Sequence, residues 1–178
     1  MLLSDGAIRS ALAMGEIDVC PFVQENLQPA SLDLTLDSTY RVPRLDVGCI
    51  DVAEVPEGHT RELCDDFVIP LEPGDFILAC TREVVRLGPA YAARVEGRSS
   101  IGRLGVQIHT TAGFIDPGFE GQITLEITNV APWEVHLRPG MRIAQLAVMR
   151  MWGTPLADYS AKGHYQGQRG PTESRFKL

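Results

Sequence analysis

A short segment rich in arginine, serine and glycine, residues 95–105, has the composition of an anion-binding turn. It carries Arg98 and Arg103 around the hydroxyls of Ser99 and Ser100. Serines at the start of a one-turn helix could cap it, and its free N–H groups could then bind a phosphate together with the arginines. The alternative is a polar turn whose arginines pair with carboxylates of the chain itself.

Glu126 is the residue best suited to move protons. It lies where the apolar residues Ile123, Leu125 and Ile127 alternate with polar ones, a pattern typical of a strand with one buried face. The carboxylate therefore shares the polar face with Thr124. Beside a cleft, such a carboxylate can act as a general acid and base, whereas on an open sheet it is a solvent-exposed charge.

Two glycine-containing segments could close around a ligand. Residues 110–121 hold three glycines and a proline, and Asp116 within them either forms a turn or binds a sugar hydroxyl or a water. Residues 159–172 combine tyrosines, glutamines and glycines with basic side chains. That composition is typical of a disordered end or of a flexible cover over a phosphorylated ligand.

The elements that must position these groups are mostly strands. Ser4 is placed to cap a helix that ends near Gly15. After this helix, apolar and polar residues alternate with a period of two, and Pro-Gly or glycine-rich turns intervene, which predicts an all-β sandwich or barrel. Strands are expected at about 32–36, 66–70, 75–81, 91–96, 105–112, 122–128, 133–137 and 142–150.

The composition fits one folded domain without a membrane segment. The chain has 178 residues, of which 44% are hydrophobic and 22% charged. No run approaches the roughly 18 apolar residues of a spanning helix. Because no secretion signal is visible and the four cysteines form no CxxC pair, we expect reduced thiols in the cytoplasm. The net charge of −7 argues against nonspecific binding to nucleic acid, although residues 160–178 are basic.

The histidines give no sign of a metal centre. The zinc deaminase signature H-x-E with P-C-x-x-C is missing, and the four histidines are scattered without metal-ligand spacing. We expect His59 and His136 at the surface and His109 within a strand.

The segments described above, in their order, resemble the dCTP deaminases of the trimeric dUTPase superfamily. The resemblance runs from Ser4 to about Arg175, and its most specific part is G-R-S-S-x-x-R at 97–103 together with the strand T-L-E at 124–126. It implies a mainly β protomer, a distorted β-barrel or jelly roll of the dUTPase type with a short N-terminal helix. Residues 1–178 would form a single domain with a flexible tail, 160–178, that closes on the nucleotide. The protomers would form a homotrimer with active sites between subunits.

The chemistry that the resemblance implies is hydrolytic deamination of dCTP to dUTP and ammonia, without zinc and with Mg²⁺ carried by the triphosphate. Glu126 would be the proton donor and acceptor that activates a water at cytosine C4. Ser99, Arg103 and the carbonyl of Ala112 would hold that water and the intermediate. The other nucleotide contacts would come from Arg98, Ser100, Ile101, Gly102 and Arg103 at the phosphates, Asp116 at the deoxyribose, Thr124 and Leu125 at the base, and Gln145, Tyr159 and Gln168.

The chain departs from the family pattern in the tail. Family members usually carry a lysine just before the tail tyrosine, where it meets the triphosphate. Here that position is His164, and Lys162 lies two residues earlier. Either Lys162 reaches the phosphates through a shifted backbone, or His164 supplies a weaker, pH-dependent contact.

Gly113 bears on the product of the reaction. Members that stop at dUTP often have a histidine after the alanine of this motif, whereas here Ala112 is followed by Gly113, as in members that continue to dUMP and pyrophosphate. A glycine leaves room for a second water near the α-phosphate, so the sequence favours the dUMP-forming type. The alternatives are a plain dUTPase, disfavoured by Glu126, and a non-catalytic nucleotide-binding regulator, disfavoured by the intact catalytic set. dTTP is a further candidate ligand, as an inhibitor.

Overall fold

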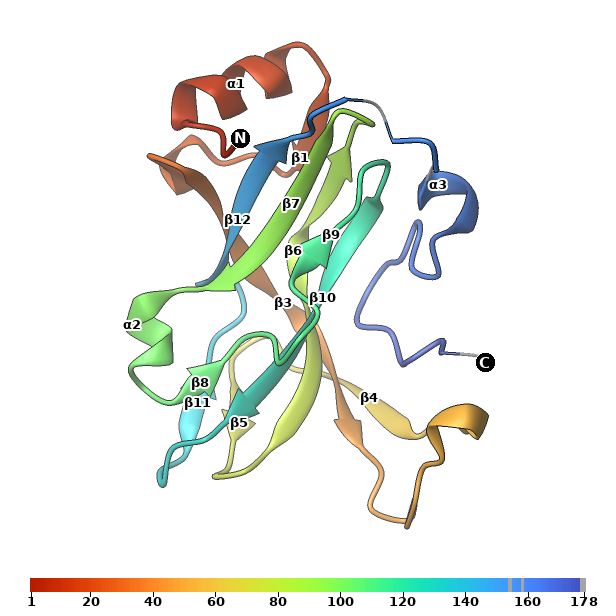
Figure 1. The fold of residues 1–178 in the computed structure, drawn as a ribbon. Helices are drawn as coiled ribbons and strands as arrows, with labels where there is room; N and C mark the ends of the chain where they lie inside the picture. Colours follow the sequence, from red (N-terminus) through yellow and green to blue (C-terminus); the bar gives the residue numbers. More distant parts are fainter. Residues whose placement is uncertain (154, 158, 177–178) are drawn as a thin grey trace.

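The computed structural model describes residues 1–153, 155–157 and 159–176, which fold mainly as strands (Figure 1). The helices are α1 (Asp5–Ala13), α2 (Ser99–Gly102) and α3 (Tyr159–Lys162), with short 3-10 turns η1 (Gln24–Asn26) and η2 (Val52–Glu54). The strands are β1 (Ile17–Cys20), β2 (Leu27–Gln28), β3 (Ser31–Pro43), β4 (Thr60–Cys64), β5 (Ile69–Leu71), β6 (Phe76–Leu87), β7 (Tyr91–Gly97), β8 (Val106–Gln107), β9 (Phe114–Ile115), β10 (Glu120–Asn129), β11 (Val135–Leu137) and β12 (Arg142–Arg150). None of the described helices is long and apolar enough to cross a membrane.

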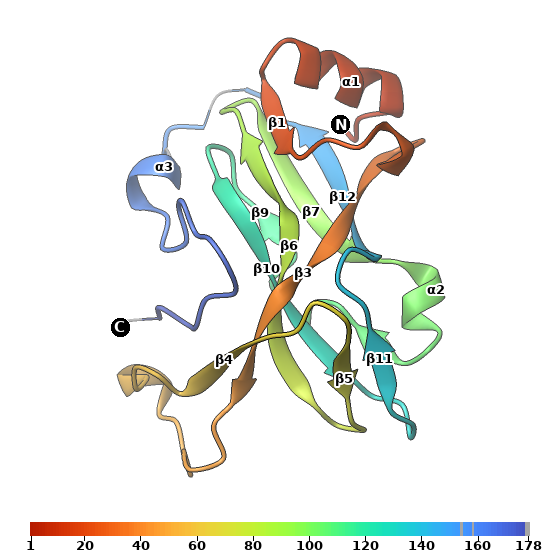
Figure 2. The same ribbon diagram turned by 180° about the vertical axis from the view of Figure 1, so that it is seen from behind.

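Ten of the strands in the described residues form one strongly curled sheet. Its main path runs β8-β10-β6-β3-β12-β7-β9, while β1 pairs with β6, and β2 and β4 pair with β3. The long strand β3 joins the two halves, because it pairs with β12 near its start and with β6 and β4 further on. Register shifts interrupt the ladders of β3 with both β12 and β6. The sheet thereby bends until β9 lies beside β10, which Figures 1 and 2 both show.

The core fills the inside of this curl with alternate residues of the strands. In β10, the side chains of Ile123, Leu125 and Ile127 are buried, while Thr124 and Glu126 on the other face are half-exposed. This follows from the pleat, because successive side chains of a strand point to opposite faces. The predicted mainly β, distorted barrel-like fold and the alternation that predicted this strand are both confirmed.

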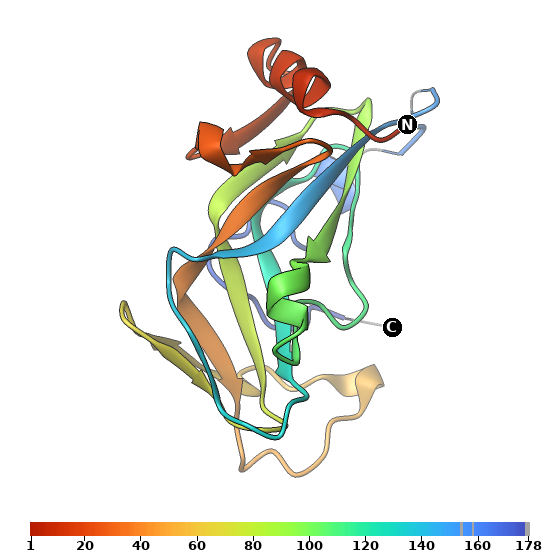
Figure 3. The ribbon, with the colours of Figure 1, turned by 90° about the vertical axis from the view of Figure 1, so that its left-hand side faces the viewer.

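The N-terminal helix α1 begins where the sequence predicts. The Ser4 hydroxyl accepts a hydrogen bond from the N–H of Ala7 at 3.4 Å. The helix packs against β1 and β3, with Ile8 and Ala11 buried. Figure 3 shows it lying across one end of the curled sheet, far from the C-terminal tail.

The strand predicted at 66–70 is displaced along the chain. The carboxylate of Asp65 accepts hydrogen bonds from the N–H groups of Phe67 and Val68, at 2.8 and 3.0 Å. These bonds turn the backbone away from a ladder, so the chain forms β4 before the turn and β5 after it.

The prediction of a strand at 105–112 is wrong beyond Gln107, where β8 ends. Its paired part, β8, contacts only the last two residues of β10. Thr110 then donates its N–H to the carboxylate of Glu126 at 3.3 Å, not to a neighbouring strand. His109 therefore lies in a loop, contrary to the expectation of a strand position.

The buried face of β3 supplies a test of the core. Leu34 is completely buried, whereas Leu45, just after the same strand, is fully exposed. Replacing a buried leucine by alanine removes apolar contact and leaves a cavity, so Leu34→Ala should lower the free energy of unfolding by about 2–5 kcal/mol. Leu45→Ala should leave it nearly unchanged. Thermal melting of both variants at one protein concentration would measure this, and equal melting temperatures would contradict the assigned core.

Candidate active site

A cavity of about 620 Å³ opens between β10, the loop before β9, the end of β3 and the C-terminal tail. It brings together six of the residues predicted for the site: Ala112, Asp116, Thr124, Glu126, Tyr159 and Gln168. The rest of its described lining is Pro43, Arg44, Val47, Ile50, His59, Thr60, Phe76, Leu78, Phe114, Ile115, Phe119, Ile123, Tyr165, Thr172 and Ser174. The site is therefore assembled from several segments that lie between residues 43 and 174 of the sequence.

Glu126 faces this cavity because of the alternation along β10. Its Oε2 accepts a hydrogen bond from the N–H of Thr110 at 3.3 Å. That bond ties the carboxylate to the loop that carries Ala112, and Ala112 also lines the cavity. A half-exposed carboxylate held in this way can take a proton from a water and return it to a leaving group.

Much of the cavity wall is apolar and suits a flat ring. Phe76, Phe114, Ile115 and Ile123 contribute apolar side chains. The ring of Phe119 lies against that of Tyr159, with 6.0 Å between centroids and a tilt of 57°. Burial raises the pKa of Tyr159 above its usual value, which keeps its phenol neutral. Apolar walls with a few polar groups are the usual composition of small-molecule sites.

The tail covers the cavity and is held along β10 by hydrogen bonds. The N–H of Gln122 donates to the carbonyl of Gln168 at 3.1 Å, and the Gln168 side chain donates back to the Gln122 carbonyl at 2.6 Å. The N–H of Gly170 donates to the Gln122 side chain at 2.7 Å. A side chain at Gly121 would approach Gln168 atoms within 3.1 Å, so glycine at this position lets the tail lie close to the strand.

The predicted phosphate cradle lies elsewhere on the protomer. Figures 1 and 2 show α2 and the C-terminal tail on opposite sides of the molecule. The cradle residues form this helix and its two caps: Arg98, Ser99, Ser100, Ile101, Gly102 and Arg103. Ser99, Ser100 and Arg103 are exposed, and the side chain of Ile101 is buried. The expectation that the serines cap the helix is wrong: Arg98 is the cap residue, and no side chain makes a capping bond.

A buried carboxylate anchors this side of the molecule. Asp33 on β3 has no exposed side-chain surface, and Arg98 and Arg142 each lie 3.3 Å from its Oδ2. Gln145 donates to its other oxygen at 3.3 Å. Arg98 thus already pairs with a carboxylate of the chain, and Gln145 belongs to this cluster and not to the cavity.

The two candidates for the missing tail lysine also lie outside the cavity. Among the described lining residues neither Lys162 nor His164 occurs. Lys162 is exposed at the end of α3. His164 borders a neighbouring open groove with Arg169 and Arg175, and its carbonyl accepts a hydrogen bond from Arg175 at 2.7 Å.

Gly113 is packed against the rest of its loop more tightly than the sequence suggests. Its carbonyl accepts a hydrogen bond from the N–H of Val95 at 2.7 Å. A Cβ at this position would lie 2.8 Å from the Val95 carbonyl oxygen and 3.2 Å from the imidazole of His109. Glycine is therefore needed here for close backbone packing, because other atoms already fill the space that a side chain at this position would occupy.

Sequence reasoning missed part of the cavity wall. His59, predicted at the surface, has a side chain only 13% exposed and lines the cavity, so that prediction is wrong. Thr60 and Arg44 line it as well. Nothing in the local pattern marks these three residues, because only the pairing of β4 with β3 brings them to the site. His136 is exposed as predicted.

The described residues contain no group of three or more His, Cys, Asp and Glu side chains that could hold a metal ion. Magnesium prefers oxygen ligands and is usually bound through one or two carboxylates plus substrate phosphates and waters. The described cavity lining includes two carboxylates, Asp116 and Glu126.

Comparison with known proteins shows the family of the chain. The sequence model of the dCTP deaminase-like family matches residues 2–151. The chain belongs to this family. It is 47% identical to a Bifidobacterium longum (strain DJO10A) protein named dCTP deaminase, dUMP-forming, over 98% of this chain and 94% of that protein. A Streptomyces coelicolor protein of the same name is 44% identical over 100% of this chain and 96% of its own.

Solved structures share the fold. The 2'-deoxycytidine 5'-triphosphate deaminase of Agrobacterium tumefaciens superposes with a TM-score of 0.67 and 24% identity, over 84% of this chain. The match covers 48% of that protein, so this chain spans about half its length. A dUTPase of Staphylococcus bacteriophage 80alpha superposes with a TM-score of 0.50 and 17% identity, over 81% of this chain and 96% of its own. This chain, a member of the dCTP deaminase-like family, therefore has the dUTPase-type fold.

The packing around Gly113 can be tested with a single methyl group. Gly113→Ala would force the Val95 carbonyl or the loop to move, because a Cβ contact of 2.8 Å with backbone is too short. We expect a lower melting temperature and loss of dCTP turnover, since the same loop carries Ala112 and the N–H that binds Glu126. Gly48→Ala is the matched control, because a Cβ there has no atom within 4 Å. A Gly113→Ala enzyme with unchanged melting and turnover would refute the packing argument.

Proposed function

We propose that this enzyme hydrolyses dCTP to dUTP and ammonia and then dUTP to dUMP and pyrophosphate. The observation that carries the first step is Glu126, which faces an apolar cavity while its Oε2 is held by the N–H of Thr110. The second step is supported by relatives named dUMP-forming at 44–47% identity over nearly the whole chain.

In the deamination, the cytosine ring would lie against the apolar wall with C4 near Glu126. The carboxylate takes a proton from a water as the water oxygen bonds to C4, and passes that proton to N3 of the ring. It then carries the remaining hydroxyl proton to the amino group as the C4–N bond breaks, which leaves the C4 carbonyl of uracil and releases ammonia. Fixed dipoles such as the Ala112 carbonyl, together with Ser99 and Arg103, would hold the water and the charge of the intermediate. Thr124 and the backbone of Leu125 would contact the base, and Asp116 the deoxyribose.

The site is completed by a second protomer in this proposal. The described lining holds two basic side chains, Arg44 and His59, against two acidic ones, Asp116 and Glu126. A triphosphate needs more positive charge than that, yet Arg103 and the serines of α2 lie on the opposite side of the molecule. A homotrimer in which α2 of one protomer meets the cavity of the next would bring the two halves together.

The remaining assignments follow from the same arrangement. Mg²⁺ would be held by the triphosphate, where it neutralises phosphate charge. Tyr159 and Gln168 would contact the nucleotide from the tail, and Lys162 or His164 would reach the phosphates from its outer side. We place the enzyme in the cytoplasm and keep dTTP as a candidate inhibitor. A plain dUTPase would have no use for a proton-transferring Glu126, and a regulator would have no use for the catalytic set.

The direct experiment is incubation with dCTP and Mg²⁺, with dCTP, dUTP and dUMP separated by chromatography. Wild-type enzyme should yield dUMP and ammonia with little free dUTP. Glu126→Gln keeps the shape of the side chain but cannot accept the proton, so kcat for dCTP should fall about 100-fold or more while nucleotide binding remains. Glu134→Gln, an exposed carboxylate outside the cavity, is the control. Retention of more than about a tenth of kcat in Glu126→Gln would exclude Glu126 as the general base.

The shared site can be tested by mixing two inactive variants. Arg103→Ala damages α2, and Glu126→Gln damages the cavity. If each site combines α2 of one protomer with the cavity of another, equal mixing with subunit exchange restores both wild-type halves in about a quarter of sites. We therefore expect about a quarter of wild-type dCTP turnover from the mixture. Persistent inactivity would mean that both halves of a site come from one protomer.

A further inference from the structure

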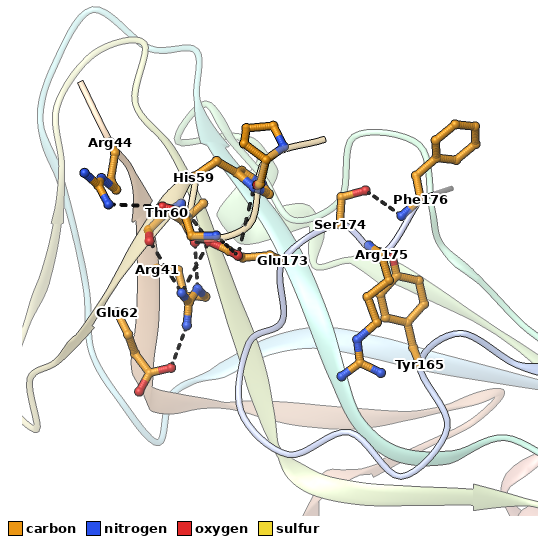
Figure 4. A network of polar contacts seen from close by, with 12 residues as sticks. Arg41, Arg44, His59, Thr60, Glu62, Tyr165, Glu173, Ser174, Arg175 and Phe176 are labelled. Atoms are coloured by element: carbon orange, nitrogen blue, oxygen red, sulfur yellow. Dashed lines mark hydrogen bonds and ion pairs between the residues drawn. The ribbon is translucent and has the colours of Figure 1, made fainter. Parts of the chain in front are cut away.

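The C-terminal tail crosses the cavity between two attachment points. The first is the run of hydrogen bonds that ties Gln168 and Gly170 to β10. The second lies at the other wall, where Glu173 meets the segment that leads into β4 (Figure 4). Thr172, between the two points, and Ser174, just beyond the second, line the cavity.

Glu173 is bound more completely than a surface carboxylate. Its Oε2 accepts the N–H of Gly58 at 3.0 Å, and its Oε1 accepts the N–H of Thr60 at 2.7 Å and the Thr60 hydroxyl at 2.5 Å. Arg41 also approaches Oε1 at 3.4 Å. The side chain is 20% exposed. Glu173 is the single acidic residue in the basic stretch 160–178, so its charge is the one part of the tail suited to this row of donors.

The charge of Glu173 is fixed at neutral pH. Burial raises its pKa, but the hydrogen bonds from Thr60 and Gly58 and the nearby His59 more than reverse this and lower the pKa to about 2. The titratable groups near it are Arg41, which also pairs with Glu62 at 2.8 Å, His59, 3.9 Å away, and Arg44, which interacts with it electrostatically. Because the folded pKa lies below the ordinary value of 4.5, the stabilisation is present above that pH and is lost as the pH falls towards 2.

The contacts of Glu173 form part of the cavity wall itself. Its two chain neighbours, Thr172 and Ser174, line the cavity, and so do His59 and Thr60 on the opposite side of the contact. Release of one carboxylate would therefore separate two sides of the wall at once. A structural ion pair remote from the site would not have this consequence.

We propose that Glu173 is a positioning residue that latches the C-terminal tail across the mouth of the nucleotide cavity by binding Gly58 and Thr60. The inference rests on the proposed function, since it assigns the retained ligand as the nucleotide. Closure of the latch encloses bound dCTP and completes the wall around it, and opening admits substrate and releases product. The latch acts through Thr172 and Ser174 and does not touch the reacting atoms.

The experiment compares Glu173→Gln with Glu57→Gln in the full-length enzyme. Both remove one negative charge, but Glu57 is an exposed residue of the adjacent loop and does not line the cavity. Glutamine at position 173 has no charge, and its NH₂ group cannot accept hydrogen bonds from the N–H groups of Gly58 and Thr60. The tail should therefore open more often. Trypsin cleavage after Arg169 and Arg175 reports that opening without any need for catalysis.

We expect tail cleavage in Glu173→Gln to be about tenfold faster than in wild type, with KM for dCTP raised about tenfold and kcat within about twofold. Glu57→Gln should match wild type in all three. Glu173→Asp keeps the charge on a shorter side chain and should fall between wild type and Glu173→Gln.

Two results would contradict the proposal that Glu173 latches the tail. Wild-type cleavage rates in Glu173→Gln would show that the carboxylate does not hold the tail. Faster cleavage with an unchanged KM, or a loss confined to kcat, would show that the attachment does not enclose the substrate. Because trypsin cleavage is independent of turnover, a protein without dCTP deaminase activity would refute the proposed function and still leave the tail attachment measurable.

Discussion

The register of β10 is the constraint on which the rest of the site depends. Its buried face is fixed by Leu125 and Ile127, which lie in the core and do not line the cavity. A slip of one residue would exchange the two faces, placing Glu126 in the core and a large apolar side chain in the cavity. The hydrophobic effect that stabilises the sheet thus also fixes the orientation of the carboxylate, and no separate interaction is required to select it.

The same face of β10 also binds the cover of the site. Gln122 holds the tail through both its backbone and its side chain, and Thr124 Oγ accepts the N–H of Thr172 at 3.4 Å. Gln122, Thr124 and Glu126 are spaced by two residues, so tail binding and proton transfer share one row of side chains. At this attachment point, the position of the tail relative to the carboxylate is therefore set by the geometry of the strand.

The sequence predicted what local patterns determine. Ser4 marked the start of α1, and the two-residue alternation marked β10. It could not predict His59, Thr60 or Asp33 as parts of functional clusters, because their partners lie far away in the chain and only sheet pairing brings them together. It misplaced β5 because the Asp65 carboxylate competes for backbone N–H groups, an effect that hydrophobic periodicity does not register.

Electrostatics connects the fold to the choice of ligand. The chain carries a net charge of −7, so a polyanion is repelled over long distances unless cations are concentrated at the site. This protomer distributes them: Arg98 is paired with a buried aspartate, Arg103 stands exposed on α2, and the tail holds further basic residues on the other side. In the proposed homotrimer, the two sides would meet between protomers and concentrate positive charge at the triphosphate.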